Sequence, residues 1–185
     1  MTRIFLSTST DRYGTNSASL CSVSQYAAGT DVSIIRSIGE LERLVSKHGA
    51  TGFGYGRDDG TARTRVVFRI ADRMVRFDVS KPDLADFKRT PTGRPRALSE
   101  ATRMQDQEEK RRWRALVLVV KALLVGVADG VISLSDAFLP YTMLPDGSTV
   151  GEWARPQLDT AYATAQMPSL MPGVVQALPG RVGVS

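Results

Sequence analysis

The chain has 185 residues, 42% of them hydrophobic, which is enough apolar material for the core of one domain. Its single cysteine and single histidine exclude an internal disulfide, a cysteine zinc site and a histidine-based catalytic triad within one subunit. The net charge is +5, and residues 57–121 carry 17 Lys and Arg against 10 Asp and Glu, a bias that favours a polyanionic partner.

The first predicted elements are an arm, a strand and a helix. Residues 1–29 are rich in Ser, Thr, Gly and Ala without a sustained periodicity, which predicts a flexible N-terminal arm. The β-branched run 30–36 predicts a strand. Ser37 and Glu40 have the spacing of a capping box, so a helix is expected from there to residue 48.

Two turns predict a three-stranded antiparallel meander. Asp59-Gly60 is a favoured pair for a two-residue hairpin. Ala71-Asp72 is expected to close a second hairpin, although its residues are poorer turn formers. The strands are then expected at 51–58, 61–70 and 73–79.

The second half of the chain is predicted to be mainly helical. Residues 81–96 carry three prolines and five basic residues, which predicts a mobile basic linker. A long helix is expected from about residue 97 to 128, and short helices follow, the last one capped by Thr149 and Glu152 and interrupted at Pro156. Residues 167–185 predict an extended tail. The sequence thus predicts an α+β domain over residues 30–166, with the order strand, helix, meander, long helix and short C-terminal helices.

The predicted register separates apolar from basic side chains. Because side chains alternate along a strand, four aromatic residues share one face, which the helices are expected to cover: Phe53, Tyr55, Phe68 and Phe77. The opposite face carries Gly52, Gly54 and Gly56 beside Arg63, Arg65, Arg69 and Arg76. Arg65 is expected to pair with Asp78 across the strands, which leaves the other three arginines without an acidic partner.

Arginines beside bare glycine backbone suit a single-stranded nucleic acid lying across the sheet, with the guanidinium groups on its phosphates. The alternative is an ordinary solvated face, with glycines that make room for a packed helix. No exposed aromatic residue is expected, so phosphate contacts should dominate. The candidate binding residues are Arg57, Arg63, Arg65, Arg69, Arg76, Lys88, Arg89, Arg94, Arg96, Lys110, Arg111 and Arg112. For the last three, ion pairing with Glu108 and Glu109 along the helix is the alternative.

The sequence gives little indication of nucleotide binding or of a catalytic metal site. The run GFGYG from Gly52 lacks the spacing of a nucleotide-binding glycine loop. The acidic pairs Asp58-Asp59 and Asp83-Asp86 could hold magnesium in a nuclease, but turns commonly contain Asp for local hydrogen bonding. We therefore expect a protein that is not an enzyme and binds no cofactor or metal.

A resemblance adds a biological setting. The runs LPDGSTVGEW, KRRWRALVLVVKALL and VVFRIADRMVRFDV resemble a widespread family of short uncharacterised proteins of actinobacterial phages and prophages. The resemblance covers roughly residues 30–173 and implies a phage setting. The expected location is the host cytoplasm. The order of elements is also loosely similar to that of phage single-strand annealing proteins, which is an analogy of fold alone.

The expected function is non-catalytic binding of nucleic acid, single-stranded DNA in the first place, in phage DNA replication or recombination. No membrane association is expected, since no window is apolar enough to span a bilayer. The alternative is a protein-interaction module, such as a host-takeover factor or a virion-assembly component. It would dock a host protein or a second copy through an apolar C-terminal segment that contains Trp153, Met167, Leu170 and Met171.

Overall fold

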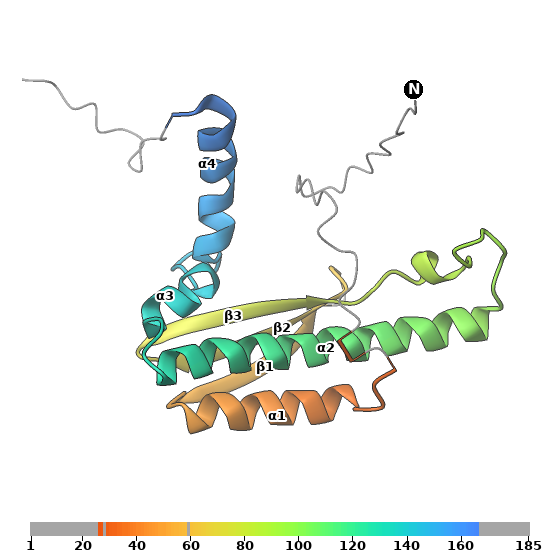
Figure 1. Ribbon diagram of the computed structural model, residues 1–185, viewed down its shortest axis with the longest axis horizontal. Helices are drawn as coiled ribbons and strands as arrows, with labels where there is room; N and C mark the ends of the chain where they lie inside the picture. Colours follow the sequence, from red (N-terminus) through yellow and green to blue (C-terminus); the bar gives the residue numbers. More distant parts are fainter. Residues whose placement is uncertain (1–25, 28, 59, 167–185) are drawn as a thin grey trace, which may run out of the picture.

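The computed structural model describes residues 26–27, 29–58 and 60–166, and the predicted C-terminal tail and most of the N-terminal arm lie outside this part. It confirms the α+β class. Figure 1 shows a three-stranded sheet with two helices against one face and a further helix that extends away from the body. In chain order the elements are α1 (Ile34–Lys47), β1 (Gly52–Asp58), β2 (Arg63–Ile70), β3 (Arg73–Ser80), η1 (Leu84–Phe87), α2 (Leu98–Ala128), α3 (Leu134–Phe138), η2 (Leu139–Tyr141) and α4 (Val150–Thr164).

The first helix begins earlier than predicted. Ser33 is the N-cap of α1, and its hydroxyl accepts a hydrogen bond from the Arg36 backbone at 3.3 Å. The predicted strand at 30–36 is therefore wrong, and so is the cap at Ser37, which is buried within the helix. The helical spacing of Ile34, Ile38, Leu41 and Val45 explains the difference, because packing of this apolar stripe outweighs the strand propensity of β-branched residues.

The second hairpin agrees with the prediction. Strands β2 and β3 are joined by Ala71 and Asp72, whose φ angles of 46° and 61° are those of a two-residue turn that matches the twist of the strands. Val66 lies opposite Phe77, as expected from this turn.

The first hairpin has a longer loop than predicted. Asp58 pairs with Arg63, so the loop holds four residues instead of two, and Phe53 lies opposite Phe68. The Asp58 carboxylate organises this loop by accepting hydrogen bonds from the Gly60 backbone at 3.0 Å and the Thr61 hydroxyl at 2.8 Å. Since the register differs by two residues, every side chain of β1 keeps its predicted face.

The core lies between the sheet and the two long helices, as predicted. Its sheet side is formed by residues such as Val66, Phe68 and Val75, all fully buried. Trp113 and Val120 of α2 and the apolar stripe of α1 cover them. The sheet therefore has one buried face, and its other face, called here the outer face, points away from α1 and α2 (Figure 1).

The segment 81–96 is more regular than predicted. It forms η1 and then a small hairpin over residues 88–96, in which the Thr90 backbone donates to Arg94 and the Arg96 backbone donates to Lys88, both at 2.8 Å. An isolated bridge joins Arg89 to Pro95. The expectation that this segment lacks regular structure is thus wrong, because residues 88–96 pair their backbone groups with one another. Its predicted mobility stays a prediction.

The C-terminal elements wrap around the free side of β3. The Met143 backbone donates to the Met74 carbonyl at 2.8 Å, which adds a short pairing to that edge. The predicted capping box is present, since Thr149 and Glu152 exchange both hydrogen bonds at the start of α4. The helix continues through Pro156 without restarting. No helix of the described residues is long and apolar enough to cross a membrane.

Candidate nucleic-acid interface

The glycines of β1 lie open on the outer face. A Cβ atom added at Gly52, Gly54 or Gly56 would meet no atom within 4 Å. These glycines therefore do not make room for a helix of the described part of the chain, so only the helix-packing part of the alternative is wrong, and a solvated face stays the alternative to a binding surface. A shallow, open depression of about 400 Å³ lies along Gly54 and Gly56, and Arg65 and Val67 of β2 also line it.

Arg76 does not belong to the open basic surface. It lies on the outer face of β3 opposite Val67, yet it is buried, because the chain around Gly147 and the start of α4 cover it. Its guanidinium donates to the Gly147 carbonyl and to the Glu152 carboxylate. The prediction that Arg76 lacks an acidic partner is wrong.

The Glu152 carboxylate is held in its charged form by this arrangement. Partial burial acts to raise the pKa of Glu152, but hydrogen bonds from the Thr149 backbone and from Arg76 outweigh that effect and lower the pKa. Glu152 therefore has two roles, since it caps α4 and attaches it to β3.

Asp78 compensates a second arginine of the outer face. It accepts a hydrogen bond from Arg65 at 3.2 Å, as the register predicts, and it also lies 3.3 Å from Arg76. Arg65 is still half-exposed despite this pair. Arg69, at the far end of the strand, is exposed and makes no ion pair with a described residue. The outer face is positive, but less so than the sequence suggests.

The basic hairpin 88–96 leaves the sheet at one end. Arg57 and Arg63 lie at that end, where the Lys81 backbone donates to the Ala62 carbonyl at 2.8 Å. Lys88, Arg89 and Arg94 of the hairpin are exposed.

Arg96 is turned inward instead. It donates to the Arg89 carbonyl at 2.8 Å and the Phe87 carbonyl at 3.3 Å, and it lies 3.7 Å from Glu100. These bonds give Arg96 a structural role in the hairpin.

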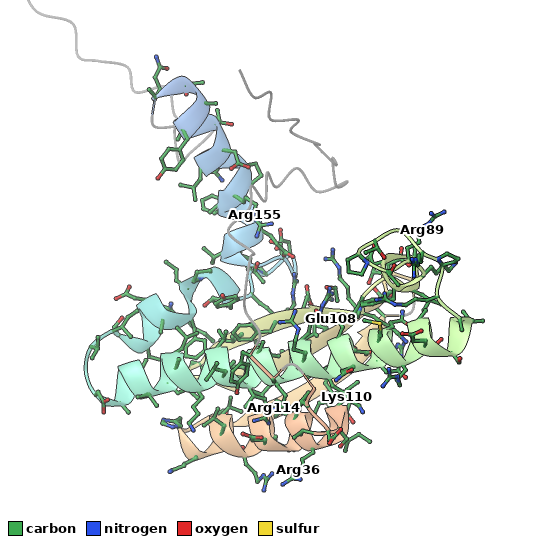
Figure 2. All side chains as sticks on the ribbon, turned by 45° about the vertical axis from the view of Figure 1, so that its right-hand side comes forward. Arg36, Arg89, Glu108, Lys110, Arg114 and Arg155 are labelled. Atoms are coloured by element: carbon green, nitrogen blue, oxygen red, sulfur yellow. The ribbon has the colours of Figure 1, made fainter. Side chains whose placement is uncertain are left out.

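The basic cluster on α2 is largely compensated. Glu108 accepts from Arg111 at 2.6 Å and from Arg112 at 3.3 Å, and these bonds, led by that of Arg111, lower the pKa of Glu108. Arg112 also donates to the Ser80 carbonyl at 2.9 Å. Lys110 lies on the opposite side of the helix from Glu108 (Figure 2). Ion pairing along the helix therefore accounts for two of the three residues.

Tyr55 is exposed, although the sequence predicts that helices cover it. It lies on the helix-covered side of the sheet, opposite Val66, but 59% of its surface is accessible. The prediction that no aromatic residue is exposed is thus wrong. A strand at the edge of a sheet can extend beyond the helices, which the alternation of the sequence does not reveal.

The acidic turns have local roles. Asp58 holds the first hairpin loop, and hydrogen bonds from Thr61 and Gly60 lower its pKa. Asp83 caps η1 by accepting from the Ala85 backbone at 2.9 Å. Within the described ranges, no group of three His, Cys, Asp or Glu side chains could hold a metal ion.

The C-terminal docking residues are only partly within the described structure. Trp153 is 47% exposed on α4, a helix without a buried residue. Leu158 and Tyr162 of the same helix are also exposed, and the sequence analysis did not single them out. Met167, Leu170 and Met171 lie outside the described residues.

Comparison with protein-family models, with curated proteins and with solved structures finds no match to this chain. The resemblance to actinobacterial phage proteins stays a prediction.

Proposed function

We propose that this protein binds single-stranded nucleic acid, DNA in the first place, without catalysing a reaction, and serves DNA replication or recombination of a phage in the host cytoplasm. The observation that carries the proposal is the open outer face, where arginines of β2 stand beside a glycine strand that nothing in the described chain covers. Bare backbone lets a ligand approach closely, and guanidinium groups bind phosphate oxygens.

The shape of the face favours a single strand over a duplex. No described helix stands on the glycine side of the outer face where it could enter a groove of double-stranded DNA. A flat, partly charged surface instead suits a flexible strand that follows it with its phosphates. The exposed cations of the hairpin 88–96 continue from the end of the sheet that carries Arg57 and Arg63.

The test reverses the charge at three exposed positions whose side chains form no ion pair with described residues: Arg69, Lys88 and Arg94. Binding of a fluorescent oligothymidine is measured by anisotropy at several salt concentrations. We expect Arg69→Glu, Lys88→Glu and Arg94→Glu together to weaken binding at low salt at least about tenfold. The slope of log affinity against log salt should fall by roughly 2, because each lost phosphate contact on a single strand contributes about 0.7.

A matched control makes the same change of charge on the other side of the molecule. Arg36, Arg43 and Lys47 are exposed on α1, and Figure 2 shows Arg36 on the side away from the sheet. Their reversal to Glu should leave most of the affinity. Equal losses of affinity in both triple variants would show that net charge alone explains the effect. Unchanged binding in the first variant would refute the proposal.

A second candidate function is docking of a protein partner, and α4 is the observation that favours it. Trp153, Leu158 and Tyr162 place large apolar surfaces on a helix that extends from the body (Figure 1). The wild-type protein and its Leu158→Glu variant are each used to isolate binding partners from infected cells, with and without nuclease treatment. A defined phage or host protein that survives nuclease and is lost with Leu158→Glu would support this function.

A further inference from the structure

The free edge of β1 has backbone groups that no described strand pairs with. The sheet has the order β1-β2-β3, so β1 and β3 are its edges. The edge of β3 is partly covered by Met143. No strand of the described residues pairs with the seven-residue edge of β1. Such an edge presents unpaired donors and acceptors and is a template for another strand.

The hydrogen bonds of the sheet show which groups of β1 face outward. Lys81 donates to Ala62, so alternation along β2 directs the backbone groups of Arg65 and Val67 toward β1. Their partners Gly56 and Gly54 therefore point toward β2. The backbone groups of Phe53, Tyr55 and Arg57 must then point to the open side.

The middle of the edge carries none of the common devices that prevent pairing, and the charged residues of β1, Arg57 and Asp58, lie at the end of the strand. Sheets usually protect an edge with proline, with an inward-pointing charge, with a bulge in its middle or with a covering segment. Here the middle of the strand is Phe53-Gly54-Tyr55-Gly56, without proline or charge. Tyr55 is 59% exposed beside this open edge.

We propose that the edge of β1 pairs with β1 of a second copy, antiparallel and about a two-fold axis at Tyr55. In this register Tyr55 lies opposite its own copy, and Phe53 of each chain lies opposite Arg57 of the other. All three positions have outward backbone groups, so each of these pairs exchanges two hydrogen bonds. The two sheets become one sheet of six strands.

The side chains of β1 fit this pairing and argue for a second copy as the occupant. On the helix-covered side the two Tyr55 side chains are neighbours across the axis, and Arg57 of one copy lies opposite Phe53 of the other, a pairing of a cation with an aromatic ring that is favourable. On the outer side Gly54 lies opposite Gly56, so no side chains collide. A surface that is complementary to itself under a two-fold rotation is the hallmark of a symmetric dimer.

This inference does not depend on nucleic-acid binding, and it is tested without nucleic acid. The full chain is examined by sedimentation equilibrium. We expect a species of twice the 20.1 kDa chain mass with a Kd in the range of roughly 1–100 μM, since a strand pairing of this length is a small interface. Tyr55→Lys places two like charges on the axis and should weaken dimerisation at least about tenfold. Val131→Lys, at an 81% exposed position after the end of α2, is the matched control and should have no effect.

A cysteine at the axis tests the register. In a Cys21→Ser background, Tyr55→Cys should form a disulfide-linked dimer on mild oxidation, because the Cα atoms of a hydrogen-bonded pair lie about 5.5 Å apart. Thr61→Cys, exposed in the hairpin loop, should not. Circular dichroism confirms that each variant is folded.

Three results would overturn the proposal. One is a wild-type chain that stays monomeric throughout this concentration range. The second is a dimer that resists Tyr55→Lys and does not crosslink through residue 55, which would place the interface elsewhere, for example on α4. The third is a monomer in which a cysteine at 55 is protected from alkylation, which would show that another segment of the same chain occupies the edge.

Discussion

Arg76 is the residue whose role depends most on the tertiary structure. Its position in the strand pattern puts it among the arginines of the outer face, and this much follows from the sequence. Its partners Gly147 and Glu152 come from a turn and a helix more than 70 residues later, and no local pattern connects them. Sequence analysis therefore predicted its face correctly and its partners wrongly.

We expect Arg76→Ala to lower the free energy of unfolding by about 2–3 kcal/mol, because it leaves the Gly147 carbonyl and the Glu152 carboxylate without their charged donor. Urea denaturation measures this change. Arg69→Ala, at an exposed position of the same face, should change the free energy by less than about 0.5 kcal/mol. Similar values for both variants would show that the buried network does not stabilise the fold.

At the scale of elements, the turn between β2 and β3 is under local strain. Ala71 and Asp72 adopt φ angles of 46° and 61°, a left-handed conformation that is costly for alanine. The strands impose this turn, because their buried residues fix the register on both sides of it.

Replacing the turn by a better pair should stabilise the protein. Asn-Gly suits both left-handed positions, so Ala71→Asn with Asp72→Gly should raise the free energy of unfolding by about 1 kcal/mol. Thermal denaturation measures the change. A decrease in melting temperature would mean that the present side chains make stabilising contacts that outweigh the strain.

The two hairpins and α1 show what sequence patterns can and cannot predict about elements. Alternation of apolar residues predicts the faces of all three strands, because a shift of two residues in the first hairpin leaves the faces unchanged. The loop length was wrong because the Asp58 side chain stabilises a wider loop than Asp-Gly propensity suggests. The start of α1 was wrong because Ile34 packs as part of a helical stripe, a tertiary effect.

At the scale of the whole molecule, carboxylates that accept hydrogen bonds from arginines join separate elements. Glu152 joins α4 to β3, and Glu108 binds Arg112, which in turn donates to Ser80 at the end of β3. Hydrogen bonds from arginines contribute to lowering both pKa values below their ordinary value of 4.5. Each carboxylate is thus protonated more readily in the unfolded chain than in the folded one.

Acid should therefore destabilise the protein in a defined window. The contribution of Glu152 is complete above its unfolded pKa of 4.5 and is lost as the pH falls through the lower pKa of the folded state. We expect the free energy of unfolding, measured with urea, to decrease from about pH 5 to pH 3. Glu152→Gln should be less stable at pH 7 and should show a shallower decrease, and an unchanged decrease would contradict this role.

The basic character of the molecule was predictable from composition, but its distribution was not. The sequence predicts a track from the sheet through residues 81–96 to α2. Acidic residues distant in the chain compensate Arg65 and Arg76, and Glu108 compensates two residues of α2. The register predicts the pair of Arg65 with Asp78, and helical spacing offers the pairs of Glu108. The pair of Arg76 with Glu152 could not be predicted, because it depends on which distant elements become neighbours.

Arg76 holds the start of α4 on the sheet, so its guanidinium group is not available to a ligand of the outer face. A partner that draws α4 away from β3 would break the bonds of Arg76 to Glu152 and Gly147 and uncover the edge now paired with Met143. The outer face would then gain a positive charge and a second open edge in a single movement. If the outer face binds a polyanion as proposed, binding at the helix would change that affinity, and the polyanion would change the affinity of the helix for its partner by the same free energy.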